Sequence, residues 1–188
     1  MESYEYIDLS PSEYYVLHPR PVYLIVVVKP EGGLNVMAAS WVTPISGEPP
    51  LVALAIGKDA LTNELLMTRR EFTINIVGEE YINEVYRAGS MSGKSIDKWS
   101  MLGFKEVKSM KINAPGIKNS YGFLECAVRS THDAGESTLF IAEVLGVHVR
   151  KDLYGRYGWN YGKARILLHD RGRAFVLPGR KVFAEKLM

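Results

Sequence analysis

A run of seven apolar residues, VYLIVVV at positions 22–28, places the tightest limit on how this chain can fold. Pro21 and Pro30 bound the run, and most of its residues are β-branched, which predicts a strand rather than a helix. Because no polar residue interrupts it, we expect both faces of the strand to be buried near the centre of a β-barrel. The run is far shorter than the roughly 20 residues that a membrane helix needs, so no membrane segment is expected.

Most other segments between turn residues are equally short. Ranges 36–43 and 51–56 are expected to join 22–28 in a meander of three strands, through turns at 32–34 and 44–50. The same patterns predict further strands at 72–77, 120–131, 138–150, 165–169 and 173–177, helices at 59–70 and 79–88, and an aperiodic loop at 89–104. Short strands without βαβ alternation predict a mainly β fold, an antiparallel and closed or nearly closed barrel with peripheral helices.

Composition limits the partners and the compartment. At 188 residues with 47% hydrophobic side chains, the chain suits one domain over residues 1–188. Lys and Arg number 23 against 21 Asp and Glu, and the net charge of +2 is too small to recruit nucleic acid or an anionic membrane. Cys126 is the only cysteine, which excludes an intramolecular disulfide. With no signal peptide recognisable at the N-terminus, this indicates the cytoplasm.

Familiar catalytic motifs are missing from the chain. It has no phosphate-binding Gly-rich loop before a helix and no serine- or zinc-hydrolase motif. The four histidines are scattered, so no metal site is expected. His148 is expected on the exposed face of a strand, between inward-facing Val147 and Val149. His132 could act with Asp133 as an acid and base, but a hairpin turn explains these residues more simply.

Residues 151–165, KDLYGRYGWNYGKAR, mix basic and aromatic side chains. This is the composition of a platform for single-stranded nucleic acid. The alternative is a long aromatic loop that packs over the barrel or over a partner subunit. Because the rest of the chain offers no basic stripe, we favour the loop over nucleic-acid binding.

Small residues in one expected strand indicate room for a ligand. Residues 38–40, Ala-Ala-Ser, stand where a packed strand usually has larger side chains, and they would let a flat ring lie against the backbone. Lys58 and Thr62 flank the start of the next helix, where amide donors and the helix dipole favour a phosphate. Together they suggest a mononucleotide-type cofactor. The simpler alternative, which the pattern alone favours, is that the small residues face a crowded core and that Thr62 or Asp59 only caps the helix.

Six segments, taken in order, resemble the flavin reductase-like family, whose members have an FMN-binding split barrel. They are HPRPVYLIVV at 18–27, NVMAASWVTPIS with EPPLVALAI at 35–56, LTNELLMTRREFTIN at 61–75, GSMSGKSIDKWSMLGF at 89–104, GESTLFIAEVLGVHV at 135–149 and LLHDRGRAFVLPG at 167–179. They cover nearly the whole chain. The resemblance implies an antiparallel split β-barrel of Greek-key topology with peripheral helices.

The resemblance also implies a cofactor site. Residues 37–41 would hold the ring and ribityl chain of FMN, three residues at the next helix would lie near its phosphate, and the loop of Lys98 would close from the side. The cofactor-binding residues expected in this way are Met37, Ala38, Ala39, Ser40, Trp41, Lys58, Thr62, Asn63 and Lys98. Family members are usually homodimers with flavin near the subunit boundary, to which residues 151–165 would contribute.

One departure from the family bears on activity. Many family reductases have Gly-Asp-His before the late strand, whereas this chain has Gly135, Glu136 and Ser137. In the family that histidine lies by the flavin face used by the nicotinamide, so its replacement by Ser137 weakens the expectation of rapid NAD(P)H turnover.

Three functions are therefore carried forward. The preferred one is an FMN-dependent oxidoreductase that passes electrons from NAD(P)H to free flavin, ferric iron or a redox protein partner. No side chain is assigned as catalytic, because the cofactor carries the chemistry and the protein orients it. The alternatives are a non-catalytic flavoredoxin-like electron carrier and a barrel without flavin that binds nucleic acid or a protein.

Overall fold

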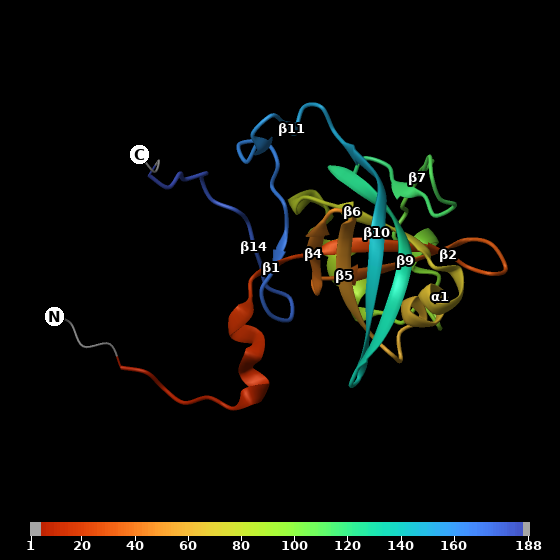
Figure 1. The fold of residues 1–188 in the computed structure, drawn as a ribbon, viewed down its shortest axis with the longest axis horizontal. Helices are drawn as coiled ribbons and strands as arrows, with labels where there is room; N and C mark the ends of the chain where they lie inside the picture. Colours follow the sequence, from red (N-terminus) through yellow and green to blue (C-terminus); the bar gives the residue numbers. More distant parts are fainter. Residues whose placement is uncertain (1–4, 186–188) are drawn as a thin grey trace.

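A seven-stranded antiparallel sheet, in the order β3-β2-β6-β9-β10-β5-β4, forms the body of the computed structural model (Figure 1). The structure describes residues 5–185; residues 1–4 and 186–188, at the two ends of the expected domain, lie outside the described residues. The strands are β2 (Tyr23–Val28), β3 (Leu34–Ala39), β4 (Val42–Gly47), β5 (Pro50–Gly57), β6 (Glu71–Ile76), β9 (Gly122–Ala134) and β10 (Ser137–Val149). The expected fold class, mainly β with antiparallel strands and peripheral helices, is confirmed.

The apolar run at 22–28 behaves as its composition predicts. It forms β2, whose central residues are fully buried on both faces between β3 and β6. The prediction of one strand at 36–43 is wrong. The chain leaves the sheet at Ser40 and re-enters it at Val42, so that β3 and β4 are its two opposite edges.

The predicted meander of three strands is therefore wrong as well. β2 pairs with β3 and β4 pairs with β5, but β3 and β4 do not pair with each other. Each pair is a hairpin closed by its own turn, at Gly32 and Gly33 and at 48–49, and the two hairpins stand at opposite ends of the sheet. Gly32 and Gly33 both have positive φ, a backbone conformation that side chains other than glycine rarely adopt. The sheet thus stays open at the point where the small residues lie.

The described residues also form five short helices. They are η1 (Pro11–Leu17), α1 (Leu61–Arg69), η2 (Glu79–Tyr81), α2 (Ile82–Ser90) and α3 (Lys98–Met101). α2 and α3 pack on β3, and α1 lies against β2, β3 and β5. The expected cap at Asp59 or Thr62 is wrong: the N-cap of α1 is Ala60, which has no side-chain hydrogen bond. Among the described residues, no helix has the length and apolar character needed to cross a bilayer.

The remaining strands are two residues each. They are β1 (Arg20–Pro21), β7 (Glu106–Val107), β8 (Gly116–Ile117), β11 (Tyr154–Gly155), β12 (Gly158–Trp159), β13 (Leu168–His169) and β14 (Phe175–Val176). β11 and β12 belong to the basic aromatic segment 151–165. Leu153 and Ala164 of this segment are buried beside Tyr121 and Ile76, so it packs over the sheet as the favoured interpretation predicts.

The expected orientation of β10 near its end is reversed. Val147 and Val149 are exposed, while His148 points to the other face and stacks on Phe123 with ring centroids 4.5 Å apart. The His148 Nε2 atom lies 2.6 Å from Oε1 of Glu125, a fully buried carboxylate. The shift in register between β9 and β10 at Val144 and Gly146 is the local irregularity that changes the alternation.

Backbone groups complete the surroundings of Glu125. The amides of Met110 and Lys111 donate to its two oxygens at 2.9 and 2.6 Å. Burial alone would raise the pKa of Glu125, but these amides and His148 favour the carboxylate and hold its pKa below the usual value. The neighbouring Cys126 is fully buried, and desolvation raises the pKa of its thiol to about 12.

Candidate functional site

Three segments distant in sequence meet beside the open part of the sheet. The register of β5 and β10 puts Ser137 opposite Gly57. In the turn that follows, the Lys58 amide donates to the Glu136 carbonyl at 2.9 Å. The start of β10 and the start of α1 are therefore held side by side, next to the β3 edge against which α1 lies.

The small residues of β3 divide between two faces. Ala38 and Ser40 line a hollow of ≈ 500 Å³. Ala39 faces the other way and is buried in the main core, and Met37 packs against the same core. The sequence offered two interpretations of this stretch, and each applies to alternate residues: Ala38 and Ser40 line an open space, whereas Ala39 faces a crowded core.

The hollow at Ala38 has the size and lining of a small-molecule site. Binding pockets for cofactors span about 300–1,000 Å³ and combine apolar walls with a few polar groups. The wall facing Ala38 and Ser40 includes aromatic and basic side chains: Tyr15, Tyr86, His169, Arg171 and Phe175. Gly89 also lines the hollow, and an added Cβ there would lie 3.4 Å from Ala38 Cβ, so the two residues approach closely at this wall. The hollow is therefore the candidate site for the flat ring expected from the sequence.

Trp41 lies at the rim rather than in the wall of the hollow. Its side chain is 37% exposed, and Tyr14 of η1 meets it edge-to-face with ring centroids 5.9 Å apart. Arg20 Nε donates to the Ser40 carbonyl at 3.1 Å, which fixes the chain where it leaves β3. The five expected ring-binding residues are consecutive but thus lie in three different surroundings: the hollow, the main core and the rim.

The start of α1 offers donors for an anion. Because Ala60 gives no side-chain cap, the first amides of the helix depend on other acceptors. Thr62 is buried, and its Oγ1 accepts a hydrogen bond from Asn35 Nδ2 at 2.8 Å. A hydroxyl that accepts still has its own hydrogen to donate, so Asn35 leaves Thr62 able to bind a phosphate oxygen.

Asn63 and Lys58 have other partners in this structure. Asn63 is buried and donates to the Ile56 carbonyl at 3.0 Å, which fixes the turn before the helix. Lys58 Nζ contacts Asp133 Oδ2 at 2.6 Å, and both side chains are exposed. Such a surface pair is worth only about 0–1 kcal/mol, so a phosphate can compete for the ammonium group. The same pair holds the pKa of Asp133 below its usual value. Asp133 also accepts from the Gly135 amide and His132 Nε2 lies 3.3 Å from Ser130 Oγ, contacts that favour the hairpin-turn explanation over a His132–Asp133 acid–base pair.

Lys98 is directed away from the hollow. It is buried, and its Nζ donates to the carbonyls of Ala88 and Met91 at 2.7 and 3.1 Å. These carbonyls end α2, where a cation is favourable. Burial lowers the pKa of Lys98 to about 8. Lys98 therefore fixes the loop that borders β3, and does not point at the phosphate end.

A second hollow near the start of α1 contains residues that the sequence interpretation missed. Its volume is ≈ 450 Å³, and its lining includes Lys29, Leu61, Gly93, Lys94 and Ser95. Lys94 pairs with Glu64 of α1, and Gly93 lies directly against Asn35 of β3. The signal was present as Gly-Lys-Ser at 93–95, inside the aperiodic loop already singled out. In residues 5–185, no group of three or more His, Cys, Asp or Glu side chains gathers to hold a metal.

Known proteins resemble this chain over most of its length, including the candidate site. A family model described as "Flavin reductase like domain" matches residues 15–177. A relative from Pyrococcus abyssi is 35% identical over 170 residues, 90% of this chain and 96% of its own. The flavoredoxin of Desulfovibrio vulgaris (Miyazaki F) has a similar structure, with a TM-score of 0.84 and 23% identity over 95% of this chain and 97% of its own. The NADH:FAD oxidoreductase of Streptomyces globisporus C-1027 gives a TM-score of 0.75 and 20% identity over 95% and 100%.

Proposed function

Because the chain belongs to the flavin reductase-like domain family, we propose that it binds FMN and is an oxidoreductase of the flavin reductase type. Electrons would pass from NAD(P)H through the bound cofactor to free flavin, ferric iron or a redox protein. FMN-binding proteins among its structural neighbours support a flavin cofactor. The proposal treats residues 1–188 as one FMN-binding domain and keeps the cytoplasmic location and the homodimer expected from the sequence.

The observation that carries the proposal is the hollow beside Ala38 and Ser40, next to a strand, β3, that is also contacted by the uncapped helix α1. Ala38 and Ser40 would bind the ring, and Thr62 with the first amides of α1 would bind the phosphate. Lys58 would exchange Asp133 for the phosphate. When bound, FMN supplies the hydride-accepting ring, and the residues named here bind it, orient it and exclude water.

Ser137 supports a second candidate, the flavoredoxin-like electron carrier. It is buried opposite Gly57, at the position where the family resemblance places a histidine. A serine hydroxyl does not titrate near neutral pH and is shorter than an imidazole, so it cannot replace that histidine as a contact for the nicotinamide. A carrier would hold FMN but oxidise NAD(P)H negligibly.

Visible absorption spectra test both candidates. The purified protein is measured before FMN is added and again after addition and removal of unbound FMN by gel filtration, then after NADH and finally dithionite, all without oxygen. Bands near ~370 and ~450 nm that bleach with NADH support the reductase. Bands that bleach only with dithionite support the carrier. No bands after FMN addition would refute both and leave the barrel without flavin.

A further inference from the structure

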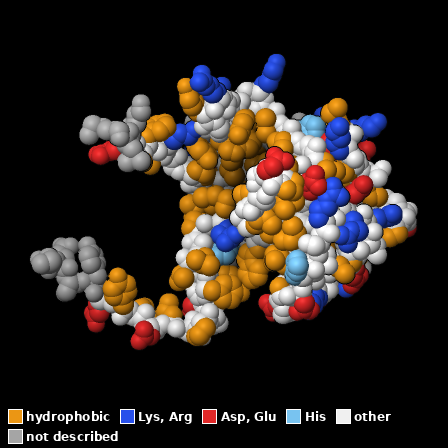
Figure 2. Space-filling model, viewed as in Figure 1, with side chains coloured by type: hydrophobic (Ala, Val, Ile, Leu, Met, Phe, Trp, Pro, Cys, Tyr) orange, Lys and Arg blue, Asp and Glu red, His pale blue; other side chains and the backbone are white. Residues whose placement is uncertain are grey.

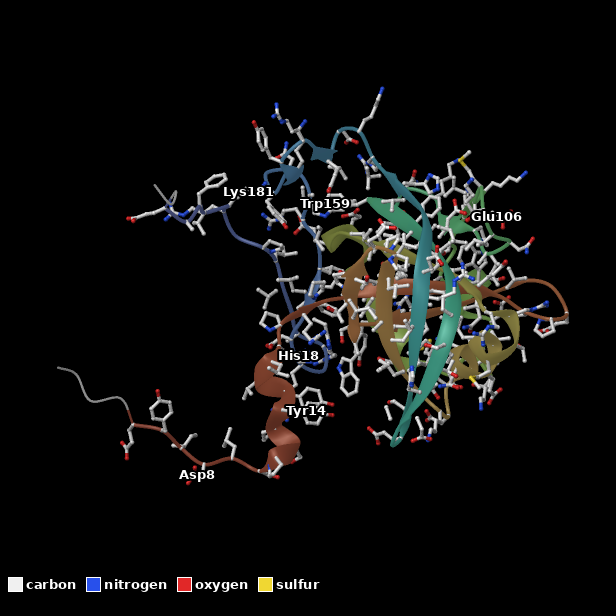
Figure 3. The ribbon with its side chains drawn as sticks, in the orientation of Figure 1. Asp8, Tyr14, His18, Glu106, Trp159 and Lys181 are labelled. Carbon is white, nitrogen blue, oxygen red and sulfur yellow. The ribbon has the colours of Figure 1, made fainter. Side chains whose placement is uncertain are left out.

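The first described residues form an apolar arm that leaves the body of the protein. We define the N-terminal arm as residues 5–17. It begins before the region that matches the family and carries exposed large side chains: Tyr6, Ile7, Leu9, Val16 and Leu17. Figure 1 shows residues 5–10 running away from the sheet, and Figure 3 places Asp8 far from it. An exposed row of this kind is a docking surface without its partner.

The direction of the N-terminal arm is fixed at its root. Tyr14 packs on Trp41, Glu13 pairs with Arg171 at 3.1 Å, and the Arg171 guanidinium lies over the Tyr15 ring. Side chains on one side of η1 are thus bound to this chain, and Figure 3 shows Tyr14 on that side. Residues 5–10, which precede these contacts, therefore extend away from the sheet (Figure 1).

An apolar groove lies on the same side of the molecule. It has a volume of ≈ 440 Å³, and its walls come from β2, β4, β10 and the segment 151–165. Hydrophobic side chains dominate its lining, among them Tyr23, Val42, Val147, Val149, Tyr154 and Trp159. Val147, inverted relative to the expected alternation, exposes 61% of its surface here. Figure 2 shows this hollowed, hydrophobic face between the two extended ends of the chain.

The charges of the arm and of the groove border are opposite. Residues 5–17 contain three acids and no Lys or Arg; Glu13 pairs with Arg171 of its own chain, which leaves Glu5 and Asp8 toward the free end of the arm. Residues 150–165, which border the groove, contain five bases and one acid. Arg150 and Arg165 pair with acids of their own chain, and the rest of the segment is still strongly basic. An acidic segment with apolar side chains therefore matches this groove in both polarity and charge.

We propose that the N-terminal arm of one copy lies in the apolar groove of a second copy, and that the second arm occupies the first groove in the same way. This inference rests on the homodimer included in the proposed function, but not on flavin binding. A two-fold axis makes the exchange reciprocal, so each copy contributes one arm and one groove. None of residues 5–17 lines the groove of its own chain, so that groove is open to the arm of the other copy.

Two double variants test the apolar contact. Ile7→Asp with Leu9→Asp places charge on arm residues that are 78% and 57% exposed in the single chain. Met110→Asp with Met67→Asp makes the same change at residues that are 79% and 49% exposed but lie outside the arm and the groove. Because both pairs are exposed, neither should affect folding of the single chain. We expect the arm variant to raise the dimer dissociation constant about 10- to 100-fold, and the control to leave it unchanged, by light scattering and sedimentation.

Engineered cysteines test which chain the arm contacts. Chains with Ile7→Cys are mixed with longer, tagged chains with Val147→Cys and oxidised with diamide, while buried Cys126 stays unreactive. A covalent heterodimer of one tagged and one untagged chain supports the exchange. In a chain with both substitutions, a disulfide that forms only within the chain would show that the arm folds into its own groove and would overturn the proposal.

Flavin binding is measured separately on every variant. If the arm variant dissociates more readily than the unchanged protein, but neither protein shows the bands of bound FMN, the arm exchange is supported and the proposed FMN binding is refuted. A chain that binds FMN but is a monomer at all concentrations, or a dimer of unchanged affinity in the arm variant, overturns the arm exchange and leaves the proposed flavin site standing.

Discussion

Replacing Gly93 by alanine tests whether the loop after α2 positions the phosphate end of the site. A Cβ at Gly93 would overlap with Asn35 Oδ1 and approach Leu61 Cδ2 to 3.2 Å. Asn35 is buried and holds Thr62 through a 2.8 Å hydrogen bond, so the loop must shift outward or that bond must break. Overpacking costs about 1–3 kcal/mol, and a lost hydrogen bond costs about 1 kcal/mol.

The free energy of unfolding should therefore fall by about 2–4 kcal/mol in Gly93→Ala. For a chain of this size, each kcal/mol lowers Tm by about 2–4 °C, so Tm should fall by about 5–15 °C. Because Thr62 loses its fixed orientation, the FMN dissociation constant should rise about tenfold. Tm is measured by calorimetry, and affinity by quenching of flavin fluorescence.

Gly155→Ala is the matched control, because an added Cβ at Gly155 meets no atom within 4 Å. It should leave both Tm and FMN affinity unchanged. A Gly93→Ala protein that melts within about 2 °C of this control and binds FMN equally well would refute the argument that the glycine is required by its contact with Asn35.

Four further changes test other parts of the structure. Ala38→Phe should fill the hollow of ≈ 500 Å³ and abolish FMN binding without unfolding the chain, as judged by absorbance and circular dichroism; normal flavin occupancy would show that the ring binds elsewhere. Thr62→Ala should weaken FMN binding about tenfold while Thr62→Ser, which keeps the hydroxyl, should not; equal affinities would remove this hydroxyl from the site. The pKa of Lys98 is lowered to about 8 in the folded state, so above that pH the unfolded state binds more protons than the folded state. The free energy of unfolding should therefore rise by about 2 kcal/mol between pH 8 and roughly pH 9.5, and urea titrations of Lys98→Met should lack this rise. Glu125→Gln should lower the free energy of unfolding by about 1–3 kcal/mol near neutral pH. Because the folded-state pKa of Glu125 is depressed, its contribution is present above the unfolded-state pKa and is lost as pH falls through the folded-state pKa. The unfolding free energies of the two proteins should therefore become equal in acid.

Local patterns predicted most elements correctly. The unbroken apolar run of β2 required burial on both faces, and the hairpin of β9 and β10 followed from two long strand-like stretches on either side of the turn at Gly135. The resemblance to flavin reductase-like proteins is confirmed by the family match over residues 15–177. These features depend on residues close in sequence or on a pattern that spans the chain.

The errors arose where distant contacts decide the structure. The residues around Ser40 do not indicate that the chain crosses there from one edge of the sheet to the other. The hairpins on either side of Ser40 are adjacent in sequence, so they were expected to be adjacent in the sheet. A bulge reversed the face of His148, and a buried partner on another strand, Glu125, then stabilised it. The fixing role of Lys98 likewise depends on where α2 ends in space.

Within the candidate site, composition indicated the correct stretch but not the role of each residue. Alternation along β3 assigns Ala38 to the hollow and Ala39 to the core, and a strand prediction alone cannot choose between these faces when both residues are small. Asn35 was overlooked because its importance comes from its two neighbours, Thr62 and Gly93, which are remote in sequence. The FMN-binding roles of these residues stay predictions until affinities are measured.

The crossing at Ser40 also has a consequence for the order of folding. The hairpins β2–β3 and β4–β5 follow each other along the chain and can form early, since their contacts are local. They cannot be united until β6, β9 and β10 have been inserted between them, and β5 pairs with β10 across about 85 residues of intervening chain. The last strand of this sheet to be synthesised, β10, thus joins the second hairpin to the rest, and a ribosome-bound chain that has not yet released β10 should have two separate hairpins and no complete sheet.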